Sequence, residues 1–94
     1  DERQITYFSL GQSWSISLHD LVLVEAEVVV KERKYFYWVI SDIYGSVIRI
    51  PDSVKGNENL LDAISSLEGV LFDQISNSMN IDSPGRKIIW QKKF

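Results

Sequence analysis

The chain has 94 residues, of which 45% are hydrophobic and 12% aromatic, and its formal net charge is −3. This composition is too apolar for a disordered segment, and the length suits one compact domain with a modest core rather than two. The negative charge argues against a broad nucleic-acid footprint, and the absence of cysteine excludes a disulfide framework and a thiolate metal site.

The sequence carries no sign of a membrane span. No apolar run approaches the roughly 20 residues that a membrane-spanning helix needs. Because the first residue is Asp1 rather than Met, we expect residues 1–94 to be a single compact domain of a longer chain. Any signal peptide or transmembrane segment of that longer chain then lies outside this sequence.

The first elements in the chain have the pattern of β-strands. Gln4 to Leu10 is a short β-rich run that stops at Gly11. Gln12 to Leu18 then alternates strictly between an apolar face and a serine face, as half-buried strands do. The apolar face carries Trp14, Ile16 and Leu18, and the other face carries Ser13, Ser15 and Ser17. Residues 19–21 (HDL) interrupt the alternation and predict a tight corner.

Two β-hairpins are predicted in the middle of the chain. Leu21 to Lys31 is a long strand, and the residues that share one of its faces are Val22, Val24, Ala26, Val28 and Val30. The charged run Lys31 to Lys34 (KERK) forms a turn, and Tyr35 to Asp42 returns with bulky residues on both faces, which indicates a central strand. Gly45 suits the second turn, and Ser46 to Ile50 pairs back until Pro51, which has no N–H, ends the ladder.

The spacing of apolar residues changes after Gly56. Leucine and isoleucine recur at intervals of three and four residues, which predicts an amphipathic helix near 57–67 with Asn57 as its N-cap. Gly69 weakens the pattern, so residues 70–79 are either a bent continuation or a second short helix. Residues 82–85 (DSPG) predict a turn, and Lys87 to Lys92 predicts a last strand.

These elements predict a mainly β, β-rich α+β fold. We expect an antiparallel sandwich or partly open barrel, capped by one amphipathic helix near 57–67, with a further strand near 87–92. The residues that we expect in the core are Trp14, Ile16, Val22, Val24, Val28, Phe36, Trp38, Ile40, Ile48, Leu60, Ile64 and Trp90.

The sequence offers little to support catalysis. His19 is the sole histidine, which excludes a multi-histidine metal site, and its place beside Asp20 in a corner is weak support for a Ser-His-Asp triad. The acidic residues are spread over turns and a helix face, where capping and solvation explain them. The glycines are isolated, so none forms a phosphate-binding loop. We therefore expect no catalytic, cofactor-binding or metal-binding residues and no enzyme activity.

The ends of the predicted hairpins are the best candidates for contact with a partner. The apolar faces of the strands are needed for the core, which leaves the turns exposed. We select Lys31, Arg33 and Lys34 in one turn and Tyr44 in the other, since an exposed tyrosine is a frequent interface anchor. The acidic helix face, with Glu58 and Asp62, is a second candidate surface.

The order of elements resembles the bacterial pleckstrin-homology-like (PH-like) domains. The resemblance covers residues 11–67 and is carried by the corner Leu18 to Leu23, the turn Asp42 to Gly45 and the strand Val47 to Ile50, followed by the helix. One departure from the family pattern is the strand that follows the helix. The resemblance implies a scaffold that binds proteins or membrane surfaces. Eukaryotic relatives bind phosphoinositides through basic residues in the first hairpin, and because Gly11 to Ser13 contains none, that activity is not carried over.

The function that we expect is a non-catalytic interaction or regulatory module of a bacterial protein, in the cytoplasm or as the soluble part of a membrane-associated protein. Two alternatives stay open: an inhibitor or immunity-type protein that binds a basic partner, and a small-ligand or enzymatic domain with a pocket between sheet and helix. An extracytoplasmic location stays open as well. We expect a protein partner and no nucleic acid. A homodimer through an edge strand, either QITYFSL or KIIWQKK, is a further expectation.

Overall fold

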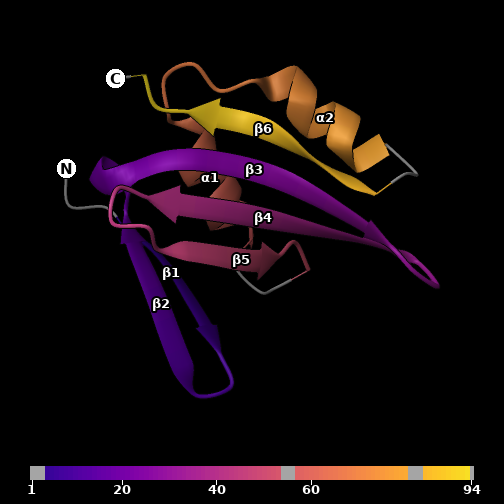
Figure 1. Ribbon diagram of the computed structural model, residues 1–94, viewed down its shortest axis with the longest axis horizontal. Helices are drawn as coiled ribbons and strands as arrows, with labels where there is room; N and C mark the ends of the chain where they lie inside the picture. Colours follow the sequence, from indigo (N-terminus) through magenta and orange to yellow (C-terminus); the bar gives the residue numbers. More distant parts are fainter. Residues whose placement is uncertain (1–3, 54–56, 81–83, 94) are drawn as a thin grey trace.

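The computed structural model describes residues 4–53, 57–80 and 84–93. In chain order the elements are β1 (Gln4–Ser9), β2 (Gln12–Ser17), a short 3-10 turn (Leu18–Asp20), β3 (Leu21–Val30), β4 (Lys34–Asp42), β5 (Val47–Pro51), α1 (Asn57–Ser65), α2 (Phe72–Asn80) and β6 (Gly85–Gln91). Figure 1 shows their arrangement. The predicted fold class, a mainly β α+β domain with antiparallel sheets, is confirmed.

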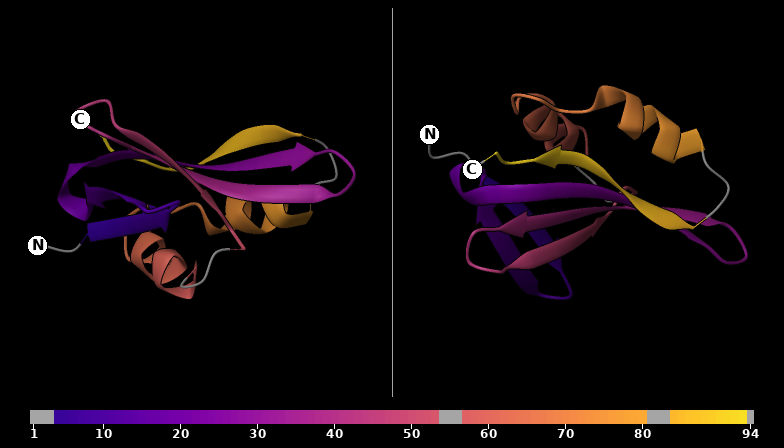
Figure 2. Two further views of the ribbon diagram at one scale, coloured as in Figure 1. Left: turned by 90° about the horizontal axis from the view of Figure 1, so that it is seen from below. Right: turned by 45° about the horizontal axis from the view of Figure 1, so that its top comes forward.

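The strands form two open antiparallel sheets. β1 and β2 pair with each other, and the other four strands form a sheet in the order β5-β4-β3-β6. In Figure 2 both helices and the β1–β2 hairpin lie on one face of the four-stranded sheet. A single apolar core fills the space between them, with contributions from both sheets and both helices.

β4 is the central strand, as its two apolar faces predict. It pairs with β3 on one side and β5 on the other. Trp38 is 1% exposed on the helix-covered face, where its cross-strand neighbours are Ala26 and Ile50. Its indole N–H donates a hydrogen bond to Asp52 Oδ1 at 3.0 Å, so the one polar atom of this buried ring is satisfied.

Eight of the twelve predicted core residues are buried, two lie at the margin of the core, and two lie outside it. The buried ones are Ile16, Val24, Val28, Trp38, Ile40, Ile48, Leu60 and Ile64, while Phe36 and Trp90 pack against the core from its margin. Trp14 is 40% exposed, because the hairpin extends beyond the core at that point. Val22 is half-buried, because an irregularity in the β3–β4 pairing between Leu21 and Leu23 places Leu21 in the core instead.

Of the two alternatives predicted for residues 70–79, the structure has the second short helix and not a bent continuation of the first. α1 ends at Ser65, and Gly69 takes the left-handed conformation at φ +90° in the connection to α2. After this glycine, Val70 is buried and the Leu71 N–H donates to the Ile89 carbonyl on β6 at 2.8 Å. Residues 72–80 therefore form a second short helix, which packs against β3 and β6. The strand predicted near 87–92 is present as β6, paired with β3.

No helix in the described ranges has the length and apolar content needed to cross a membrane.

Replacing Trp38 with alanine tests the central place of β4. Trp38→Ala should lower the free energy of unfolding by about 3–5 kcal/mol, because it leaves a cavity at the middle of the sheet. Chemical denaturation monitored by circular dichroism gives the value. The control Val47→Ala on β5 removes a side chain that is 61% exposed and should cost less than about 1 kcal/mol. Equal costs for the two variants would show that Trp38 is not the centre of the core.

Candidate functional site

The β1–β2 hairpin is buried in the core only at its base, and Tyr7, further along β1, packs against the core from its margin. Ile5 and Ile16 are cross-strand partners and are 6% and 1% exposed, and Leu18 directly after β2 is buried beside them. Beyond this pair no residue of β1 or β2 is buried. The rest of the hairpin extends away from the four-stranded sheet (Figure 1).

The outer part of the hairpin is held together by its own side chains. The rings of Tyr7 and Trp14, which are cross-strand partners, stack with centroids 5.6 Å apart. One pair closer to the base, Thr6 Oγ1 and Ser15 Oγ are hydrogen-bonded at 2.9 Å. Such cross-strand pairs stabilise a hairpin that has little cover from the core. Phe8 lies on the opposite face from the stacked rings and is 75% exposed.

The turn of the hairpin carries a fully exposed leucine in an unfavourable conformation. Leu10 and Gly11 form a two-residue loop with φ values of +53° and +77°. This conformation favours Asn-Gly, and a non-glycine residue held there costs on the order of 1–3 kcal/mol. Leu10 is 99% exposed, so no packing within the chain offsets that cost. An apolar side chain is therefore held at the apex of the hairpin with no role in folding.

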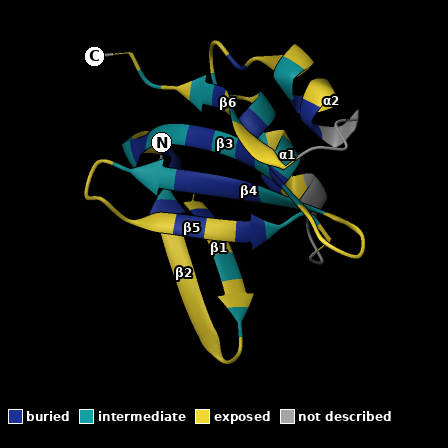
Figure 3. Ribbon diagram, turned by 45° about the vertical axis from the view of Figure 1, so that its right-hand side comes forward, coloured by how far each residue is buried: buried dark blue, intermediate teal, exposed yellow. Residues whose placement is uncertain are grey.

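The hairpin also lacks charge. From Gln4 to Ser17 there is no Asp, Glu, Lys, Arg or His. Figure 3 shows that exposed residues dominate β2 and the turn. We call residues 7–14 the hairpin tip: it projects from the domain, is uncharged, and exposes one aliphatic and two aromatic side chains, namely Leu10, Phe8 and Trp14. An apolar projection of this kind is typical of a contact surface.

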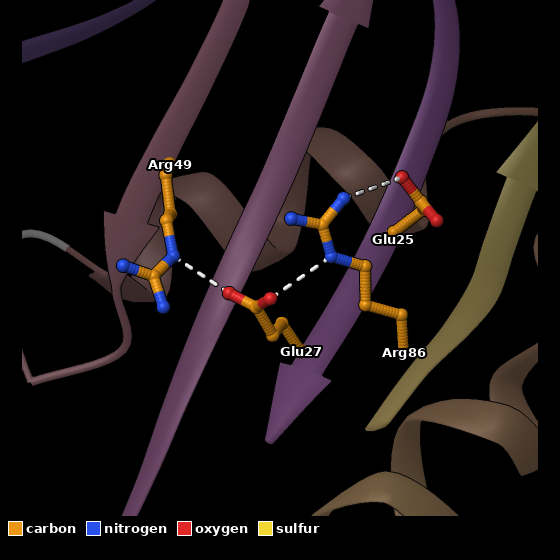
Figure 4. Close-up of polar contacts among 4 residues, drawn as sticks. All are labelled: Glu25, Glu27, Arg49 and Arg86. Atoms are coloured by element: carbon orange, nitrogen blue, oxygen red, sulfur yellow. Dashed lines mark hydrogen bonds and ion pairs between the residues drawn. The ribbon is translucent and has the colours of Figure 1, made fainter. Parts of the chain in front are cut away.

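A different arrangement occupies the face of the four-stranded sheet opposite the helices, which we call the open face. Glu27 on β3 lies between two arginines: Arg49 Nε on β5 is 2.6 Å from Glu27 Oε1, and Arg86 Nε on β6 is 2.9 Å from Glu27 Oε2 (Figure 4). Arg86 also lies 3.7 Å from Glu25. The guanidinium of Arg49 stacks over the Tyr37 ring at 3.8 Å. The charges of the open face are thus paired with one another.

This network shifts the pKa of its central carboxylate. Burial raises the pKa of Glu27, but the hydrogen bonds and positive charges of Arg86 and Arg49 lower it by more, so the pKa lies below its usual range. The ionised form is therefore favoured by folding. Because both arginines are about half exposed, at 48% and 49%, the stabilisation is that of a surface network.

Glu27→Gln tests this network through its dependence on pH. At pH 7 the substitution should lower the free energy of unfolding by about 0.5–1 kcal/mol, the range of good surface ion pairs. A carboxylate whose pKa is lower in the folded state stabilises the fold above its unfolded pKa of about 4.3, and this contribution is lost as the pH falls through the folded pKa. The difference between the two proteins should therefore shrink as denaturation is measured at lower pH. A constant difference would contradict the ion-pair account.

The contact residues predicted from sequence lie apart from one another. Residues 31, 33 and 34 are exposed at the β3–β4 turn, where the guanidinium of Arg33 lies 5.0 Å from the Tyr35 ring centre. Tyr44 is 76% exposed in the turn at the other end of β4. Asp62 is exposed on α1, and the side chain of Glu58 lies outside the described part of the chain. The structure does not assemble these residues into one surface.

Two further regions are relevant to the alternative function of a small-ligand or enzymatic domain: a groove beside β6 and the corner that contains His19. An open groove of about 860 Å³ lies between the α1–α2 connection and β6, and its lining residues are Glu68, Gly69, Leu71, Ile88, Trp90, Gln91, Lys92 and Lys93. The side chain of His19 is exposed, and its backbone N–H bonds to Ser17 Oγ at 3.3 Å. Among the described residues, no group of three His, Cys, Asp or Glu side chains could hold a metal ion.

Comparisons with protein-family models, curated proteins and solved structures found no match for this chain. The resemblance to PH-like domains stays a prediction, and the candidate site depends on the geometry of the chain itself.

The sequence contained a signal for the hairpin tip that the predictions did not use. The sequence pattern places Phe8 and Leu10 in a strand that is a candidate edge for a homodimer, and Trp14 in the core. A leucine directly before Gly11, in the middle of a stretch of 14 residues without charge, is unusual for an exposed turn, where Asn or Asp is favoured.

Proposed function

We propose that this chain is a non-catalytic interaction domain that contacts its partner through the hairpin tip. The observation that carries the proposal is Leu10, which is 99% exposed in a left-handed turn position that favours Asn or Gly. A side chain that weakens the turn and gains no contact in the fold is best explained by a contact outside the fold. The resemblance to PH-like scaffolds supports the same class of function.

The other surfaces support the proposal less well. The open face pairs its own charges, so a partner there would have to displace ion pairs already formed. The turn with Tyr44 has a structural explanation, because Asp42 Oδ1 accepts hydrogen bonds from the N–H groups of Tyr44 and Ser46 at 2.9 Å and fixes an ordinary turn. Asp62 on α1 is exposed, and solvation explains an exposed carboxylate on a helix face, which is weak support for an inhibitor of a basic partner.

Site-specific photo-crosslinking in cells tests the proposal with a matched pair of positions. Phe8 is 75% exposed and Tyr44 is 76% exposed, so the photoreactive analogue p-benzoylphenylalanine samples solvent equally at both. We expect adducts, with protein or with lipid, at position 8 and none above background at position 44. Purified protein of each variant should retain the unfolding transition of the parent.

The reverse result would contradict the proposal. Adducts at position 44 alone would assign the contact to the β4–β5 turn. Adducts at neither position would show that the hairpin tip is not a contact surface.

A further inference from the structure

We infer that the hairpin tip inserts end-on into the surface of a lipid bilayer. This inference rests on the proposed function and names the partner class. It differs from headgroup recognition by basic residues, because the tip carries no charge from which a headgroup site could be built. Three features of the hairpin support insertion: the order of its side chains, its lack of charge, and the exposure of apolar side chains on both faces of the tip.

The side chains follow the polarity gradient of a membrane surface. Leu10 is at the apex, Phe8 is two residues behind it, and the stacked rings of Tyr7 and Trp14 follow. At about 3.4 Å per residue, the ring pair lies roughly 10 Å behind the apex. Interfacial segments bury their apolar side chains about 5–10 Å into the boundary between headgroups and acyl chains, where tyrosine and tryptophan are enriched. Leu10 would then reach the acyl region while the rings stay among the headgroups.

The lack of charge removes the largest cost of insertion. A charged side chain near the bilayer centre costs at least about 2.5–3.5 kcal/mol, and the 14 residues from Gln4 to Ser17 contain none. With a net charge of −3, the chain as a whole has no attraction to anionic lipid. Binding should therefore be hydrophobic and insensitive to salt, in contrast to binding by a polybasic segment.

The geometry favours end-on and shallow insertion over a flat contact. Phe8 and Trp14 lie on opposite faces of the hairpin, so a flat partner surface could cover only one of them, whereas a fluid bilayer surrounds both. The edges of this two-stranded sheet leave backbone N–H and C=O groups unpaired, and these groups need water or headgroups. Insertion should therefore stop near the hydroxyl pair of Thr6 and Ser15.

Vesicle binding by the purified protein tests the inference. The probe is unilamellar vesicles of phosphatidylcholine, with and without added phosphatidylglycerol, at low and high salt. Co-sedimentation gives the partition coefficient, and Trp14 reports insertion by a blue shift of its emission, because Trp38 is already buried and Trp90 packs against the core. A Trp14→Phe protein identifies the part of the emission that comes from Trp14.

Two variants of the tip and one control make the test specific. Leu10→Asn removes the apex side chain and places a residue that favours this conformation in the turn, so it should melt no lower than the parent. Phe8→Ser removes the second apolar group. Each should lower partitioning about tenfold, the effect expected for losing one well-buried apolar side chain. The control Ile43→Asn removes an isomeric side chain, 48% exposed, from the β4–β5 turn and should partition as the parent does.

The outcomes separate this inference from the proposed function. Partitioning that depends on Leu10 and Phe8, persists at high salt and does not increase with phosphatidylglycerol supports insertion. No partitioning, partitioning that Leu10→Asn leaves unchanged, or partitioning that salt abolishes would overturn it. If position 8 forms adducts with protein in cells while vesicles are not bound, the tip contacts a protein and only the lipid assignment fails.

Discussion

The helices and the β1–β2 hairpin cover only one face of the four-stranded sheet, and the rest of the structure depends on this constraint. On the covered face, Trp38 and its neighbours need α1, α2 and the base of the β1–β2 hairpin to exclude water. On the open face, Glu27 pairs with Arg86 of the neighbouring β6 and, across β4, with Arg49 of β5. Val39 of β4, the cross-strand partner of Arg49, is only 2% exposed. From the paired residues of the hairpin, the core buries only Ile5 and Ile16. Beyond that pair Tyr7 packs against the margin of the core, while Phe8, Leu10 and Trp14 are exposed.

The fold was predictable where the spacing of apolar residues indicated a single kind of element and a single position for it in the fold. The two apolar faces of β4 predicted its central position, and the apolar spacing after Gly56 predicted α1. The errors arose where the burial of a residue depended on the tertiary structure and not on its place in the strand pattern. Alternation gave Trp14 the same face as Ile16, but it could not give the distance at which the hairpin leaves the core. Similarly, a regular strand places Val22 inside, and only the pairing irregularity near Leu21 reverses this.

The candidate site was less predictable than the fold, for a related reason. Turns such as KERK and DIYG are recognisable from composition, and Tyr44 and the basic residues 31, 33 and 34 are indeed exposed. The tip of the first hairpin has no such composition, because its leucine, phenylalanine and tryptophan are the residue types that normally fill a core. Only the exposure of these side chains in the folded chain distinguishes a contact surface from a core. The left-handed conformation of Leu10 depends on the two-residue loop between paired strands, which strand propensity alone does not specify.

In the proposed account, the hairpin tip contacts a lipid surface through its exposed side chains, and the rest of the domain does not take part in that contact. Amide hydrogen exchange, followed residue by residue with and without phosphatidylcholine vesicles, tests this claim most directly. Without vesicles, protection should be greatest in β3 and β4 and low beyond the Ile5–Ile16 pair. With vesicles, protection should rise in residues 7–14 and stay unchanged in β3, β4 and the helices. A rise over the open face or the helices, or no change in residues 7–14, would contradict the account.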